Sequence, residues 1–207
     1  MSTHGYTGVR RFLFDSVAET GSRRTPTPVF FVRASDHPPA PRMSPYAKVL
    51  VPLDGTPFAE TALTYLRNAE YCFVSQILLL RAVAPPTPPS SADFAGMATP
   101  VDQQSLQLTV DQEKAAARRY LAQTAAHYLK GRDTSTRVPV SVTARAIVDA
   151  ASEPSIELIV MATHGRTGLD RLAHGSVAQH VLHHAAVPVL LLHGVDPRAQ
   201  VQGTPRP

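Results

Sequence analysis

The stretch over residues 157–176 constrains the fold of this 207-residue chain more than any other part of the sequence. Its apolar run at residues 158–161 has the length and the β-branched content of a fully buried strand, and it stops abruptly in small and polar residues. We therefore expect the strand to end in a loop that begins at Ala162. An amphipathic pattern starts directly after Gly175, so the same loop is expected to end at the N-terminus of a helix.

The end of this loop has the features of an anion site. Ser176 and Gln179, three residues apart, form the pattern of a capping box, which places the first free N–H groups of the helix beside Gly175. Unpaired N–H donors, the positive end of a helix dipole and glycines without side chains together favour a phosphate. The stretch is not a Walker A loop, because no Lys-Ser or Lys-Thr pair follows the glycines.

The net positive charge of the chain comes from its two end segments. Residues 1–42 carry six Arg against three acidic residues, whereas residues 43–193 carry twelve basic and twelve acidic residues. The pI of 9.5 therefore does not indicate a nucleic-acid surface. No apolar run approaches the ~20 residues that a membrane span needs. Cys72 is the only cysteine, which excludes an intrachain disulfide and favours a reducing compartment, and we expect a cytoplasmic protein.

Apolar strand patterns alternate with helical patterns along most of the chain, which predicts an α/β fold. We expect a single doubly wound domain of the Rossmann-like or flavodoxin-like kind, with a five-stranded, mainly parallel sheet and helices on both faces. In such sheets a ligand binds at the carboxyl ends of the strands, at the switch point of the topology. The expected strands are residues 48–53, 76–83, 138–142, 157–161 and 187–192, and the expected helices begin near residues 57, 106 and 147.

The chain divides into three parts in this interpretation. Residues 1–45, which contain several Pro and Arg, are expected to be a disordered N-terminal tail, within which residues 29–32 could make a short strand. The folded domain is expected over residues 46–193, interrupted by a flexible proline-rich loop at 84–104. Residues 194–207 are expected to be a C-terminal tail. Met43 looks like the natural opening of such a domain and is a candidate for the true start.

Three motifs resemble the universal stress protein family, and together they extend over residues 46–193. The first is Lys-Val-Leu-Val-Pro-Leu-Asp-Gly-Thr at 48–56, and the last is the strand Val-Pro-Val-Leu-Leu-Leu at 187–192. Between them, Ala162-Thr163-His164-Gly165, nine further residues and Gly175-Ser176 are similar to the family's nucleotide signature, Gly-x2-Gly-x9-Gly-Ser/Thr. The chain departs from this signature at Ala162, where the family has glycine, and also in the segment before Ile147.

The resemblance implies an adenine-nucleotide site. Asp54 would accept a hydrogen bond from adenine or ribose, although an Asx turn onto Gly55 is the alternative reading. Val83 would offer adenine a backbone contact, and Arg166 would pair with the outer phosphates. The implied cofactor-binding residues are Pro52, Leu53, Asp54, Val83, Met161, Ala162, Gly165, Arg166, Gly175, Ser176, Val177 and Ala178.

By this resemblance the chain would be an ATP-binding stress-response module that takes ATP with Mg²⁺ and signals or binds a protein partner. Two alternatives remain open: a dimeric interaction protein of the same fold that binds no nucleotide, and a slow ATP hydrolase. We expect no catalytic residue and at most weak hydrolysis. We also expect no metal site at His180, His183 and His184, and neither nucleic acid nor membrane as a partner. A homodimer is expected through the apolar strand at residues 187–192, which would otherwise be an exposed edge.

Overall fold

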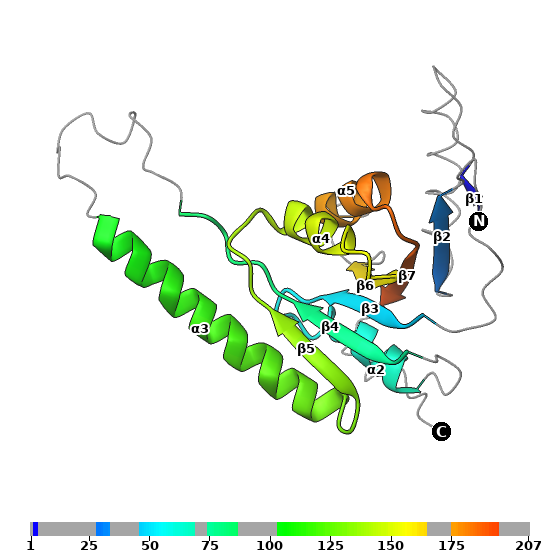
Figure 1. Ribbon diagram of the computed structural model, residues 1–207, viewed down its shortest axis with the longest axis horizontal. Coiled ribbons are helices and arrows are strands. Elements are labelled where there is room, and N and C mark those ends of the chain that lie inside the picture. The colour runs from blue at the N-terminus through cyan, green and yellow to red at the C-terminus, as the bar shows by residue number, and fades with distance from the viewer. Residues whose placement is uncertain are drawn as a thin grey trace, which may run out of the picture.

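The computed structural model describes residues 2–3, 28–33, 46–68, 74–86, 103–164 and 175–194, and these residues form one sheet with helices on both faces (Figure 1). The strands are β1 Ser2–Thr3, β2 Val29–Arg33, β3 Lys48–Pro52, β4 Gln76–Leu80, β5 Asp133–Arg137, β6 Leu158–His164 and β7 Val189–Gly194. The helices are α2 Thr61–Asn68, α3 Gln103–Tyr128, α4 Thr143–Ala151 and α5 Ser176–His184.

The sheet has the order β1-β2-β7-β6-β3-β4-β5, and the five strands from β7 to β5 are parallel. The chain runs from β3 outward through β4 to β5, and then returns to the other side of β3 for β6 and β7. The switch point therefore lies between β3 and β6. The expected doubly wound α/β fold is confirmed, but the sheet has seven strands rather than five because β2 and β1 extend it beyond β7.

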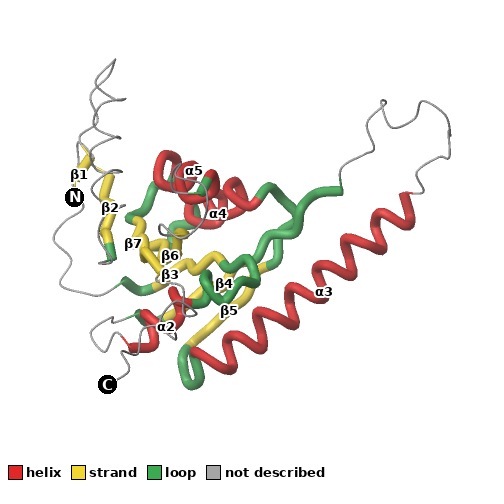
Figure 2. The backbone as a smooth tube through the Cα atoms, turned by 180° about the vertical axis from the view of Figure 1, so that it is seen from behind, coloured by secondary structure: helices red, strands yellow, loops and turns green. Residues whose placement is uncertain are grey.

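Two helical layers cover the sheet, with α2 and α3 on one face and α4 and α5 on the other (Figures 1 and 2). The alternation of side chains along β3 explains why both faces are core. Val49 and Val51 pack on the side of α2, whereas Leu50 packs on the side of α4 and α5. All three are fully buried, as expected for a parallel strand with helices on both sides.

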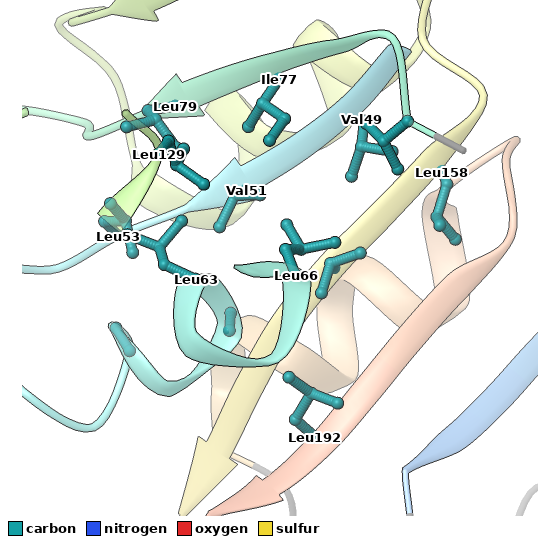
Figure 3. Close-up of a cluster of buried hydrophobic side chains, with 14 of the residues drawn as sticks. Val49, Val51, Leu53, Leu63, Leu66, Ile77, Leu79, Leu129, Leu158 and Leu192 are labelled. Atoms are coloured by element: carbon teal, nitrogen blue, oxygen red, sulfur yellow. The ribbon is translucent and has the colours of Figure 1, made fainter. Parts of the chain in front are cut away.

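Figure 3 shows how α2 closes its face of the sheet. Leu63 and Leu66 lie on the same side of α2 and point toward the strands, where they join Val51 and Leu192 in one buried cluster. Truncation of such a buried leucine to alanine typically destabilises a fold by about 2–5 kcal/mol. The packing of α2 therefore stabilises the strands whose ends carry the site described below.

A carboxylate on the chain just before α2 attaches α3 to this layer. The hydroxyl of Tyr120 donates a hydrogen bond to Oε1 of Glu60 at 2.9 Å, and the hydroxyl of Tyr128 donates to Oε2 at 3.1 Å. Burial and the Glu60 carboxylate both raise the pKa of each tyrosine, so the hydroxyls stay protonated as donors. The guanidinium of Arg81 lies 4.8 Å from the centroid of the Tyr120 ring, as in a cation–π contact.

The predicted strand at residues 138–142 is wrong. The strand that pairs with β4 is β5, five residues earlier, and at Val140 the chain makes only an isolated bridge to Val83. Pro139 explains the difference, because proline has no N–H to donate to a ladder. Arg137, the last residue of β5, donates two hydrogen bonds to the carboxylate of Glu153, which lowers the pKa of that carboxyl group.

The possible strand at residues 29–32 is present as β2, although it lies within the expected N-terminal tail. It pairs antiparallel with β7, at the end of the sheet opposite β5 (Figures 1 and 2). This pairing was not predicted, because it joins segments about 160 residues apart with no local signal. The outer edge of β7 is therefore not open along the paired residues. Among the described residues, no helix is long and apolar enough to cross a membrane.

Candidate functional site

A pocket of about 220 Å³ lies at the carboxyl ends of β3 and β6, at the switch point of the sheet. Its walls come from the ends of these two strands and from the beginnings of α4 and α5. The structure thus brings together most of the residues that the sequence predicts for the site. Of those predicted, Pro52, Leu53, Asp54, Met161, Ala162, Gly175, Ser176, Val177 and Ala178 line the pocket.

The N-terminus of α5 opens into the pocket without a side-chain cap. Gly175 occupies the N-cap position with φ −46° and ψ 148°, and no side-chain hydrogen bond caps the helix. The predicted capping box is therefore wrong, because Ser176 is already the first helical residue. The N–H of Gln179 donates to the carbonyl of Gly175 at 3.1 Å, so the three N–H groups before it have no acceptor in the helix.

A second helix begins at the same pocket. Thr143, the first residue of α4, is part of the lining, and the N-cap residue Val142 gives no side-chain cap. Neither α4 nor α5 has an acidic residue in its first turn. Both helices therefore direct the positive ends of their dipoles toward one region, where a negatively charged group would be stabilised. This second N-terminus was not predicted, because the helix was expected to begin near residue 147.

One polar atom in the wall is buried without a partner. Thr163 is 4% exposed, and its hydroxyl has no hydrogen bond among the described residues. An unsatisfied buried hydroxyl destabilises a protein by about 1–3 kcal/mol, so such a group in a folded protein requires an explanation. Thr163 and the uncapped start of α5 both belong to the pocket lining, which makes a ligand bound there one candidate for the missing partner.

Asp54 is positioned by the turn that follows β3. Its Oδ1 accepts hydrogen bonds from the N–H of Thr56 at 2.8 Å and from the hydroxyl of Thr56 at 2.6 Å. These bonds form the predicted Asx turn, although the N–H that Asp54 accepts from belongs to Thr56 rather than to Gly55. Gly55, between them, has a φ of 94°, which suits a glycine. Among the described residues Oδ2 has no hydrogen-bond partner, so a carboxylate held by its own turn still offers one oxygen to the pocket.

Val83 lies apart from the predicted site. It is not part of the pocket lining, and both of its backbone groups are already bonded. Its N–H donates to the carbonyl of Pro139 at 2.9 Å, and its carbonyl accepts from the N–H of Ser141 at 2.9 Å. A contact from its N–H to a ligand would require the first of these bonds to open. Gly165 and Arg166 lie outside the described residues.

The histidines of α5 interact with one another. The rings of His180 and His184 stack with centroids 4.1 Å apart, and Nδ1 of His184 lies 2.8 Å from the carbonyl oxygen of His180. Across the part of the chain that the structure describes, no group of three or more His, Cys, Asp or Glu residues is placed to hold a metal ion.

Besides Thr163, five residues of the lining were not predicted. Thr143 and Ile147 come from the first turns of α4, and Leu80 is the last residue of β4. Phe58 and Ala59 belong to the turn that leads into α2. Leu80 and Thr143 had a usable signal, since the ends of parallel strands and the starts of the following helices meet at one edge of the sheet. Both were missed because the strand and helix boundaries were placed several residues away.

The family model described as "Universal stress protein family" matches residues 45–193 of this chain. A universal stress protein of Methanocaldococcus jannaschii is 27% identical over 147 residues, which cover 71% of this chain and 82% of the relative. The structure of a universal stress protein from Lactobacillus plantarum is similar with a TM-score of 0.57 and 25% identity, and the match covers 72% of this chain and 99% of the other. A family member from Arabidopsis thaliana, described with AMP bound, matches at 14% identity over 73% of this chain and 94% of its own, with a TM-score of 0.48.

Proposed function

The chain belongs to the universal stress protein family, and from this premise we propose that it binds an adenine nucleotide in the pocket between β3, β6 and the N-terminus of α5. The observation that carries the proposal is the buried hydroxyl of Thr163, which lacks a partner near a helix start that is itself uncapped. Backbone N–H groups at a helix start bind phosphate. A ligand with phosphate oxygens would satisfy both kinds of group at once.

In the proposed complex the phosphates lie against Gly175 and the first turn of α5. The free carboxylate oxygen of Asp54 accepts a hydrogen bond from ribose or adenine. Apolar lining residues such as Leu53, Phe58 and Met161 offer the base a surface from which water is excluded. Gly165 and Arg166 complete the phosphate contacts in this proposal, and Val83 joins only if its N–H leaves Pro139.

The ligand we propose is ATP, which would bring Mg²⁺ with it as the bound counter-ion of its phosphates. The protein then acts as a nucleotide-dependent signalling or binding module for a protein partner. Backbone amides rather than a lysine hold the phosphates, so binding should depend weakly on the charge of the domain. A cytoplasmic location, expected from the cysteine content, stays a prediction.

Titration calorimetry of the full chain with ATP, AMP and adenosine tests this proposal. We expect saturable binding of one ATP per chain, weaker binding of AMP and the weakest binding of adenosine, because each lost phosphate removes charge-assisted hydrogen bonds of about 1.5–3 kcal/mol each. Equal affinity for all three would place the phosphates outside the pocket. If none of the three binds, the result would instead favour the alternative that this chain is an interaction protein that binds no nucleotide.

Hydrolysis is expected to be negligible. The groups that the pocket supplies hold phosphates, and among the lining residues only Asp54 is a carboxylate, whose Oδ1 already accepts two hydrogen bonds from Thr56. Single-turnover measurement with labelled ATP and magnesium distinguishes a binding module from the slow hydrolase. Turnover faster than about 1 s⁻¹, within the usual range of enzymes, would contradict the binding module.

The homodimer through residues 187–192 also stays a prediction, but the fold restricts it to chains in which β2 does not cover β7, so a chain with β2 in place is expected to be a single copy. Residues Val189, Leu190 and Leu191 pair with β2 of the same chain. A second copy can therefore pair with this part of β7 only after β2 has left it.

A further inference from the structure

The outer edge of β7 is paired within the chain by β2, in a sheet whose central five strands are parallel. Val29 lies opposite Leu191, Phe30 opposite Leu190 and Phe31 opposite Val189, and the two strands run antiparallel. β1 extends β2 on its far side, with Ser2 opposite Val32. The edge of β7 is thus covered along its apolar residues.

Both faces of the sheet hold β2 in place. Phe30 packs against the buried cluster on the side of α2, and its ring centroid lies 6.1 Å from that of Tyr46. Phe31 points to the opposite face and packs against the cluster on the side of α4 and α5. Val32, the next residue, is 37% exposed. The two phenylalanines therefore make β2 part of both cores, and Val32 contributes little to that packing.

The two edges of the parallel sheet differ in composition. β5, at one edge, is Asp-Thr-Ser-Thr-Arg, and its side chains are exposed or half-buried. β7, at the other, begins Val-Leu-Leu-Leu, with Leu191 fully buried. An uncovered apolar edge offers its N–H and C=O groups to any other strand, whereas polar edges are protected against such pairing. Within the described chain, a further strand is added only at the apolar edge.

The strand that would replace β2 most readily is β7 of a second copy. Two copies related by a two-fold axis bring their β7 strands together antiparallel, which is the direction that β2 already uses. β2 and a second copy therefore compete for the same backbone groups. We propose that β2 is an internal cap that prevents pairing of the β7 edge with a second copy, and that release of β2 turns this edge into a self-association surface.

Light scattering of the full chain and two variants tests the cap. Phe30→Asp with Phe31→Asp removes the packing on both faces while the chain stays complete, and Val32→Asp places one like charge on the same strand at an exposed position. At concentrations on the order of 100 µM, we expect the wild-type chain and Val32→Asp to have the mass of one copy, 22.3 kDa for the wild type. The double variant is expected to have about twice that mass.

Two results would overturn the proposal. One is a double variant that keeps the mass of one copy while its circular dichroism matches the wild type, since the uncovered edge would then not pair. The other is a wild-type chain that already has the mass of two copies, which would show that β2 does not prevent association.

A cross-link keeps the test decisive if the double variant aggregates. Phe31→Cys with Val189→Cys, in a Cys72→Ser background, places two cysteines opposite each other at a spacing that permits a disulfide. On a non-reducing gel, a cap within the chain gives a product that migrates as one copy. A product of twice the mass would show that β2 pairs with another chain and would contradict an internal cap. Nucleotide is absent from both tests, so their outcomes are independent of the binding proposal.

Discussion

The N-terminus of α5 and the outer edge of β7 present the same physical problem and have opposite solutions. At each place, backbone N–H groups have no hydrogen-bond acceptor within their own helix or strand, and such groups need an acceptor from elsewhere. At β7 the chain supplies the partner itself, because β2 pairs with Val189, Leu190 and Leu191. At α5 no side chain caps the helix, and the nearby hydroxyl of Thr163 is also unpaired among the described residues.

The contrast separates a structural surface from a binding site. An apolar edge is a hazard that the fold removes, and two phenylalanines on opposite faces hold the cover in place. An uncapped helix start beside a pocket remains open, because the N-cap residue Gly175 has no side chain and Ser176 is already the first helical residue. Groups left open in a pocket, where the chain could have closed them, point to a ligand as the missing partner. The first three predictions below test this interpretation.

The largest effect is expected at Gly175. Its φ of −46° is allowed for any residue, and a Cβ added there meets no atom within 4 Å, so Gly175→Val should fold. The new methyl groups would instead occupy the approach of the phosphates to the first turn of α5. We expect ATP binding to weaken at least tenfold, which corresponds to the loss of one charge-assisted hydrogen bond of about 1.5–3 kcal/mol.

Titration calorimetry checks this value, with Gln179→Ala as the control. Gln179 is exposed on the same helix and is not part of the pocket lining, so its truncation should leave the affinity unchanged. Equal affinity of Gly175→Val and the wild type would show that the phosphates bind elsewhere.

At Thr163 we expect an effect of intermediate size, in which the free protein becomes more stable and ATP binding becomes weaker. Thr163→Val keeps the shape and removes the hydroxyl, so the free protein should gain on the order of 1 kcal/mol and melt about 2–4 °C higher. ATP binding should weaken by roughly threefold to tenfold, the value of one neutral hydrogen bond.

Thr163→Ser is the matched control, since it retains the hydroxyl and should keep most of the affinity. Calorimetric melting and titration of both variants provide the test. A less stable Thr163→Val protein with unchanged affinity would mean that the hydroxyl already has a partner in the free protein.

The smallest effect is expected at Ala162, where the family has glycine. Ala162 lies within β6 and pairs with Leu192, so its backbone is extended and the alanine causes no left-handed strain. Only the methyl group limits the approach of the ligand. Ala162→Gly should tighten ATP binding by about twofold to fivefold, less than 1 kcal/mol, and destabilise the strand by about 0.5–1 kcal/mol. Weaker binding in this variant would mean that the methyl group contacts the nucleotide favourably.

The sequence predicted the parts of this fold that local patterns determine. The apolar runs of β3, β6 and β7 identified the buried strands, and their alternation with helices gave the doubly wound class. β5 was misplaced because its residues are polar, and pairing with β4 rather than hydrophobicity makes it a strand. β2 was recognised as a possible strand, but its partner could not be, because no local pattern joins segments so far apart.

Part of the candidate site was likewise predicted from the sequence, and part of it was missed. Asp54 and Gly175 were found because motifs identify strand ends and helix starts. Thr143 was missed because the start of α4 was expected near residue 147, four residues after its actual position. Thr163 was missed for another reason, since a threonine at the end of a strand is common and only its burial without a partner makes it notable.

The measurement that tests the central claim most directly is the response of individual backbone amides to ATP. In two-dimensional ¹⁵N–¹H spectra of the full chain, the account predicts that the largest shifts on adding ATP occur at Ser176, Val177 and Ala178. The amides of Leu190 and Leu191, in the strand that β2 covers, should stay in place. Unchanged amides in the first turn of α5 at saturating ATP, with the largest shifts elsewhere, would contradict the assignment of this pocket as the nucleotide site.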